Sequence, residues 1–189
     1  MEKLLLQMTN DLNKNIKLIN KEDCVLYDGK TFLHLLVDKK YNEENCFLAI
    51  KSLLKGGVNV NKKDDFGYNF IQTALYTGYS EKFILNIINE SLKYNLNVNH
   101  VDDDKDTIMH TAIYSDGYKG EINNIYNLLC NNGFNSLQED KEGRNLVEAM
   151  IYQKYPSSKV KEFKKVFVQQ ITEKSDEKKK SKFKILRRK

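Results

Sequence analysis

The sequence predicts an all-α protein in which about four similar helix–turn–helix units stack side by side. One pattern recurs every 38 residues, starting at positions 29, 67, 105 and 143. Each unit has a helix-capping residue, a short apolar segment, and then an apolar stripe with helical spacing. A unit of this size cannot bury its apolar face alone, so neighbouring units have to cover one another.

The first helix of each unit is expected to begin two residues after the unit start. Thr or Asn stands there, and its side-chain oxygen satisfies an exposed N–H group of the first helical turn. Short apolar segments follow in every unit. The predicted N-cap residues are Thr31, Asn69, Thr107 and Asn145.

The second helix of each unit is predicted from apolar residues at i, i+3, i+4, i+7 and i+8. Gly57, Asn95 and Gly133 follow this stripe at equal spacing and tolerate the left-handed conformation that ends a helix. In the last unit the stripe continues between lysines, as a C-terminal capping helix requires. The stripes contain Cys46, Ala49, Ile50, Leu53 and Leu54; Ile84, Ile87, Ile88, Ser91 and Leu92; Ile122, Ile125, Tyr126, Leu129 and Cys130; and Val160, Phe163, Phe167 and Val168.

These boundaries divide the chain into a helical domain, residues 1–173, and a basic tail, residues 174–189. An apolar stripe over 4–19 predicts a helix within an N-terminal cap. The tail is expected to be disordered by itself because charge dominates its composition. The domain divides into a cap over 1–26 and units over 27–64, 65–102, 103–140 and 141–173.

The chain resembles the ankyrin repeat family, and the first unit carries the resemblance best. It has Gly-x-Thr-x-Leu-His followed downstream by Leu-Leu-x-x-Gly-x-x-Val-Asn. Three features depart from the family: a longer unit than its roughly 33 residues, no Pro after the Thr, and no His in the second and fourth units. A HEAT-like array of helical pairs is the alternative. The matching residues are Gly29, Thr31, Leu33, His34, Leu53, Leu54, Gly57, Val60 and Asn61.

The resemblance implies a non-catalytic module that binds a protein partner through its concave groove, as an adaptor, effector or inhibitor. Tyr76, Tyr114 and Tyr152 recur at one position of successive units and would form a row along this groove, beside acidic residues. The alternative interpretation is that these tyrosines only cover neighbouring helices. The residues predicted to bind the partner are Phe66, Tyr68, Tyr76, Asp103, Asp104, Asp106, Tyr114, Arg144 and Tyr152.

Charge is concentrated in the tail. The net charge of the protein is +5, and residues 174–189 hold nine basic and two acidic residues, or +7, which leaves −2 for residues 1–173. Contact of the tail with a membrane surface (anionic lipid) or nucleic acid, with the repeats as scaffold, is therefore the alternative function. A solubilising tail is the simpler possibility. The basic residues singled out are Lys178, Lys179, Lys180, Arg187 and Arg188.

Catalysis is not expected, since the sequence has no phosphate-binding glycine loop, nucleophile motif or zinc-ligand pattern. By resemblance, His34 and His110 would hydrogen-bond the adjoining turn, whereas His100 is a lone loop residue. Cys46 and Cys130 are expected in the core, and Cys24 in the cap. The sequence thus predicts no cofactor, no metal and no small-molecule substrate, and a chain that is monomeric alone. It is placed in the cytoplasm, or in a host cytosol for a translocated effector.

Overall fold

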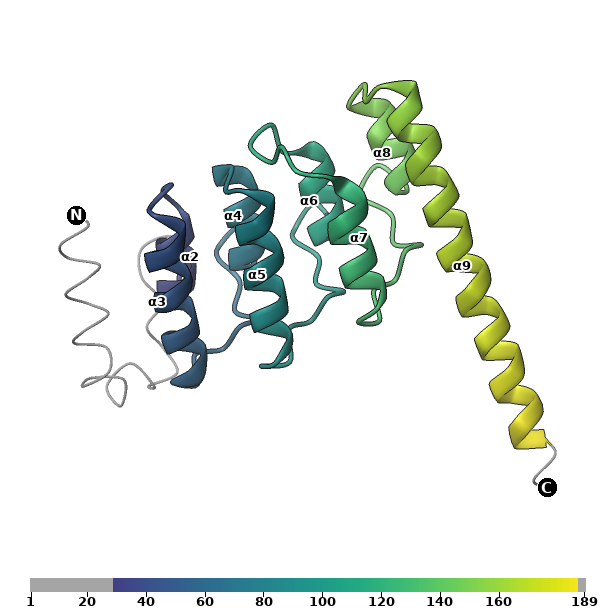
Figure 1. Cartoon of the computed structure of the whole chain (residues 1–189), viewed down its shortest axis with the longest axis horizontal. Helices are drawn as coiled ribbons and strands as arrows, with labels where there is room; N and C mark the ends of the chain where they lie inside the picture. The colour runs from purple at the N-terminus through teal and green to yellow at the C-terminus, as the bar shows by residue number, and fades with distance from the viewer. Residues whose placement is uncertain (1–28, 187–189) are drawn as a thin grey trace.

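The computed structural model describes residues 29–186 and is all-helical over that range, as predicted (Figure 1). Two isolated β-bridges, Lys63 with Asn69 and Val101 with Thr107, are the other regular pairings there. The expected N-terminal cap, including Cys24, lies outside the described residues. The helices are α2 (Phe32–Val37), α3 (Glu43–Lys55), α4 (Phe70–Thr77), α5 (Glu81–Leu92), α6 (Ile108–Tyr114), α7 (Ile122–Cys130), α8 (Leu146–Tyr152) and α9 (Ser157–Leu186).

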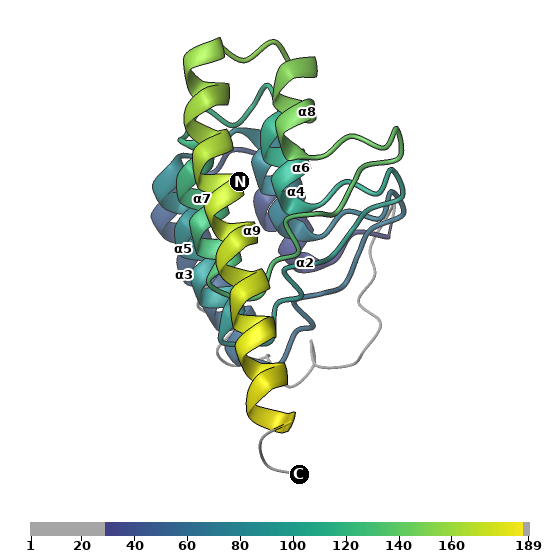
Figure 2. The same cartoon turned by 90° about the vertical axis from the view of Figure 1, so that its right-hand side faces the viewer.

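The helices form two rows. The first helices of successive units, α2, α4, α6 and α8, pack in one row, and the second helices, α3, α5, α7 and α9, pack in the other. Viewed from the end, the loops between units project together on the side of the first row (Figure 2). The apolar stripes face the space between the rows, where Ile50, Ile87 and Ile125 are fully buried. Val168, predicted as part of the last stripe, is instead 51% exposed. The buried side chains form one continuous core along the array.

Capping residues set the helix ends where the sequence predicted them. Thr31, Asn69, Thr107 and Asn145 are the N-caps of α2, α4, α6 and α8. In each case the side chain three residues later accepts a hydrogen bond from the N-cap backbone N–H, which completes a capping box. The φ angles of Gly57, Asn95 and Gly133 are 91°, 60° and 90°, so the predicted left-handed ends are confirmed.

The first helices α2, α4 and α6 are each bonded to the loop of the next unit by one buried polar side chain. Nε2 of His34 and of His110 lies 2.9 and 3.3 Å from the carbonyl oxygens of Tyr68 and Arg144. Burial lowers the pKa of both imidazoles, which favours the neutral ring. Because Nδ1 accepts from the N-cap N–H, the proton lies on Nε2, which donates to the carbonyl oxygen. The predicted structural role of these histidines is therefore confirmed.

The second unit has Gln72 in place of the histidine, and the sequence did not predict what this residue does. Its Nε2 donates to the Asp106 carbonyl oxygen at 3.1 Å, the same loop contact that the histidines make. It also lies 3.0 Å from the carboxylate of Asp102 and 3.0 Å from the hydroxyl of Thr111. Gln72 thus replaces the histidine and adds two side-chain contacts to the third unit.

Asparagine side chains connect the opposite ends of the units. The Asn61 side chain donates to the Asn95 carbonyl at 2.8 Å and accepts from the Asn97 N–H at 2.7 Å. Asn99 repeats both bonds with the following unit, to Gly133 and Asn135. Because the contacts recur with the 38-residue period, the spacing between units is held at both ends.

Replacing Gly67 with Ala is expected to destabilise the fold by about 3 kcal/mol, against about 1 kcal/mol for Gly143→Ala. Both glycines have positive φ, 80° and 75°. A Cβ at Gly67 would lie 2.7 Å from the backbone nitrogen of Asp103, whereas nothing lies within 4 Å of one at Gly143. Urea unfolding gives the loss in the free energy of unfolding for each variant. Equal losses for the two variants would contradict close packing of the Gly67 loop against the next loop.

α9 continues to Leu186, through part of the segment for which the sequence predicts a tail that is disordered by itself. Lysine and glutamate are good helix formers, so a helix started by packed residues extends readily into this segment. The start of α9 is held by Phe163 and Phe167, which pack on Tyr126 with ring centroids 5.0 and 6.2 Å away. Lys178, Lys179 and Lys180 therefore lie on a helix, while Arg187 and Arg188 lie outside the described residues. No helix in the described part is both long and apolar enough to span a membrane.

Candidate functional site

A buried aspartate shapes each projecting loop. Asp64, Asp102 and Asp140 are almost fully buried. In each, one carboxylate oxygen accepts hydrogen bonds from the backbone N–H groups two and four residues later, at 2.8 to 3.0 Å. This local pattern folds residues 64–68, 102–106 and 140–144 into three similar turns, called here the tip loops. The backbone of each tip loop is therefore held in a defined turn.

The first aromatic group consists of Phe66, Tyr68 and Tyr76. Ring centroids lie 6.3 Å apart for Phe66 and Tyr68 and 5.4 Å apart for Tyr68 and Tyr76. Phe66 is 61% exposed and Tyr76 is 42% exposed. Burial, the nearby Tyr68 and the charges of Asp106 and Asp102 raise the pKa of Tyr76, so its hydroxyl stays protonated. The structure thus groups three of the predicted binding residues on one accessible surface.

The second aromatic group consists of Tyr114 and Tyr152, with the guanidinium of Arg144 over both rings. Its central carbon lies 4.2 Å from the Tyr152 centroid and 5.4 Å from that of Tyr114. The rings meet edge to face, with centroids 6.4 Å apart. Tyr152 is 63% exposed, whereas Tyr114 is half-buried and donates its hydroxyl to Asp140. Three more of the predicted binding residues, Tyr114, Arg144 and Tyr152, therefore lie together.

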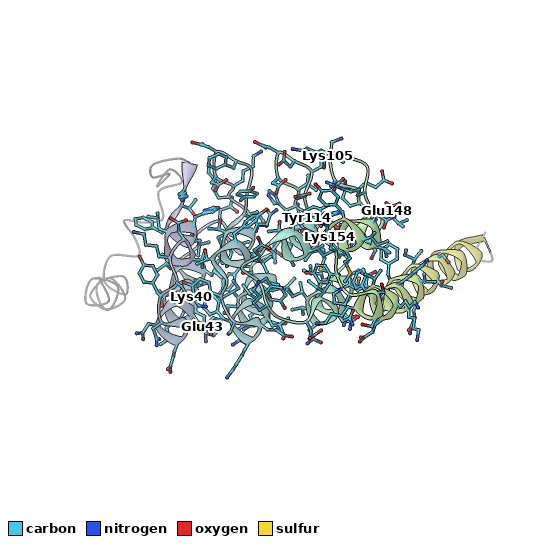
Figure 3. The ribbon with its side chains drawn as sticks, turned by 90° about the horizontal axis from the view of Figure 1, so that it is seen from above. Lys40, Glu43, Lys105, Tyr114, Glu148 and Lys154 are labelled. Atoms are coloured by element: carbon cyan, nitrogen blue, oxygen red, sulfur yellow. The ribbon has the colours of Figure 1, made fainter. Side chains whose placement is uncertain are left out.

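No ring contact joins Tyr76 to Tyr114 within the described range, so the row of tyrosines is interrupted. Asp106 lines a depression together with Tyr114, and its charge contributes to the raised pKa of both Tyr76 and Tyr114. Figure 3 shows Lys105 among the projecting loops and Tyr114 nearer the helices. Sequence spacing gave the positions of the tyrosines but not this division.

Arg144, Lys141 and Lys63 at the tip loops are each paired with a carboxylate. Arg144 Nε lies 2.7 Å from the buried carboxylate of Asp140, and its Nη2 contacts Glu142. Burial opposes ionisation of Asp140, but hydrogen bonds from Tyr114 and Arg144 outweigh it and hold the pKa at about 2. Lys141 pairs with Asp104 at 2.6 Å, and Lys63 lies 3.8 Å from Asp103.

A depression of about 180 Å³ opens between the tip loops and α6 and α8. Asp106 lines it and is only 8% exposed. No hydrogen bond or ion pair from the rest of residues 29–186 reaches its carboxylate. Burial and the charges of Asp102, Asp140, Asp104 and Glu142 raise its pKa to about 7. The depression is lined by Asp104, Asp106, Tyr114, Lys141, Glu142, Arg144, Tyr152 and Gln153.

The other reactive side chains have structural contacts. His100 Nε2 lies 2.7 Å from the Gly67 carbonyl oxygen, which gives this loop histidine a role that the sequence did not predict. Cys46 and Cys130 are in the core as expected, and burial raises the Cys46 thiol pKa to about 12. Across the described residues, His, Cys, Asp and Glu do not gather in threes suited to a metal ion.

A scan against protein-family models finds no match, and a search of curated proteins finds none either. The functional conclusion therefore depends on the geometry of the tip loops and of the first helical row.

Proposed function

We propose that the chain is an ankyrin-type solenoid that binds a protein partner through the face formed by the tip loops and by α4, α6 and α8. One observation carries the proposal. Phe66, Tyr76 and Tyr152 are well exposed on this face, although the loops and helices that hold them are firmly bonded to one another. Tyrosine on a rigid support loses little conformational entropy on binding.

The chemistry of this face favours a partner with an apolar anchor and basic residues. Aromatic side chains supply contact area. Tyrosine is enriched among interface residues whose truncation to alanine costs about 2 kcal/mol or more of binding free energy. The two aromatic groups are flanked by carboxylates of Asp103, Asp104 and Glu142. These charges would steer a basic partner toward the face.

The second candidate function is binding of anionic lipid or nucleic acid by the basic end of α9. It is favoured by the continuation of α9 to Leu186, which carries the lysines of residues 178–180 away from the array in Figure 1. Such binding would weaken steeply with salt. It would also be lost on truncation after Glu173, which leaves the residues that pack on Tyr126 in place.

The test is affinity capture with the full chain, followed by measurement of the dissociation constant for each purified captured protein. Tyr76→Ala/Tyr152→Ala is expected to weaken a genuine complex at least thirtyfold, corresponding to about 2 kcal/mol. Both side chains are exposed, so their loss should leave the fold intact, which circular dichroism checks. The 1–173 chain should bind as tightly as the full chain.

The matched control is Leu48→Ala/Val168→Ala. These residues are each 51% exposed, on α3 and α9 of the opposite row, and should change the dissociation constant less than twofold. A partner that binds the tyrosine variant as tightly as the unaltered protein contradicts the proposal. Binding that is lost only in the 1–173 chain supports the second candidate instead.

A further inference from the structure

Asp106 is the one acidic side chain around the depression whose charge no described neighbour balances. Lys141 pairs with Asp104, and Arg144 pairs with Asp140 and Glu142. Residue Asp106 is 8% exposed and borders the depression, and its carboxylate has no bond to another residue of the 29–186 range. A buried carboxylate without a partner is unfavourable, and natural proteins usually pair such groups.

The surroundings of Asp106 suit a cation on a flexible stem. The depression beside it is open to solvent, and the Tyr114 and Tyr152 rings in its wall offer apolar surface for methylene groups. The unbalanced groups favour a positive charge over an anion, since the local acids outnumber the local bases. A metal ion is disfavoured, because the site gathers no third suitable ligand.

We propose that the depression at Asp106 is the receptor for a lysine or arginine side chain of the protein partner, which forms an ion pair with the Asp106 carboxylate. This inference rests on the proposed function for its occupant, but the site itself is testable without the partner. It adds a specificity element to the aromatic groups, because neutral residues would leave the carboxylate unpaired.

Binding at this site is expected to depend on pH. With a pKa near 7, Asp106 is largely protonated at pH 6 and ionised at pH 8, so a cation displaces the proton at low pH. Affinity should therefore rise about tenfold from pH 6 to pH 8, while the lysine or arginine stays charged. The groups that face Asp106 are Asp102 and Asp104 of its own loop, Asp140, Lys141, Glu142 and Arg144 of the next, Tyr68 and Tyr76 of the previous unit, and Tyr114 of α6.

The experiment is an NMR titration of the full chain with the peptides acetyl-Gly-Arg-Gly-amide and acetyl-Gly-Lys-Gly-amide, at matched ionic strength. Saturable shifts of the Asp106 carboxyl carbon are expected with at least one of them, which also separates guanidinium from ammonium. Acetyl-Gly-Gln-Gly-amide is the neutral control. The peptide concentration that gives half of the maximal shift should be about ten times higher at pH 6 than at pH 8.

The isosteric variant Asp106→Asn should lose the response, followed there through the backbone signals of residues 106 and 114. Asp116→Asn removes an exposed carboxylate from the α6–α7 loop and should retain it. The inference is overturned if wild-type protein gives no saturable shift at pH 8, or if Asp106→Asn or the Gln peptide responds equally. A peptide response together with a partner that tolerates Tyr76→Ala/Tyr152→Ala would leave the site standing and reject the proposed function.

Discussion

Replacing Gln72 with Leu should lower the free energy of unfolding by about 4 kcal/mol. Leucine fills a similar volume but withdraws the N–H donors from the Asp102 carboxylate, the Asp106 carbonyl and the Thr111 hydroxyl, which are all buried. It also removes the oxygen that accepts from the Asn69 N–H. Several buried polar groups would lose a partner at once, and each such loss costs about 1 to 3 kcal/mol. Urea unfolding measures the total.

Gln72→His serves as the rescue variant, because His34 and His110 make the equivalent bond to the next loop. It should recover about half of the loss, since a histidine reaches the Asp106 carbonyl but cannot also serve Asp102 and Thr111. Gln138→Leu, which removes a solvent-exposed bond to the neighbouring carbonyl, should change stability by less than about 0.5 kcal/mol. Gln72→Leu within 1 kcal/mol of wild type would show that the contacts between units at this position contribute little.

Asp106→Asn should stabilise the protein at pH 8 by about 2 kcal/mol, half of the roughly 4 kcal/mol that a three-unit pKa difference represents. The sign follows from the raised pKa of about 7 in the folded protein against about 3.9 in an unfolded chain. The folded state holds the proton more tightly than the unfolded chain does. The contribution of protonated Asp106 to the stability of the wild-type protein is therefore fully present below pH 3.9 and is lost as the pH rises through 7. The asparagine, which never ionises, avoids that loss.

The difference between Asp106→Asn and wild type should therefore shrink below about 0.5 kcal/mol at pH 4, where the carboxyl is protonated in the folded state. Thermal or urea unfolding of both proteins at pH 4, 6 and 8 measures it. Asp116→Asn should show no comparable trend, because its side chain is exposed. A stabilisation that does not grow with pH would contradict an isolated buried charge. If Asp106→Asn is more stable than wild type but no longer binds the peptide, Asp106 serves recognition at a cost in stability.

The stacked helical pairs follow from local rules, which is why they could be predicted. N-caps, apolar stripes and left-handed helix ends each depend on residues within one or two turns, and the 38-residue period repeats them. The C-terminal end of α9 was not predicted, because the charged composition of this segment is typical of disorder. The segment nevertheless consists largely of good helix formers and continues a helix that is already packed.

The candidate site was only partly predictable. Their positions in the units predicted that the binding residues would gather at the loops, and Phe66, Asp106 and Arg144 do lie in the tip loops. The part played by Gln72 was not predictable, because it depends on contacts with residues 30 or more positions away. The only signal in the sequence was the replacement of a histidine by another side chain that can donate a hydrogen bond.

The sequence by itself determined which residues start and end each helix and which face of it is apolar, because hydrogen bonding and side-chain spacing within a single unit are sufficient for that. Only the tertiary structure decided how charges from successive loops combine. Several carboxylates lie close enough in sequence to pair with Arg144. In the folded protein it pairs with Asp140 and Glu142, and the Asp106 carboxylate has no cation beside it. Burial and electrostatic balance are properties of neighbours brought together by stacking, and a linear pattern does not contain them.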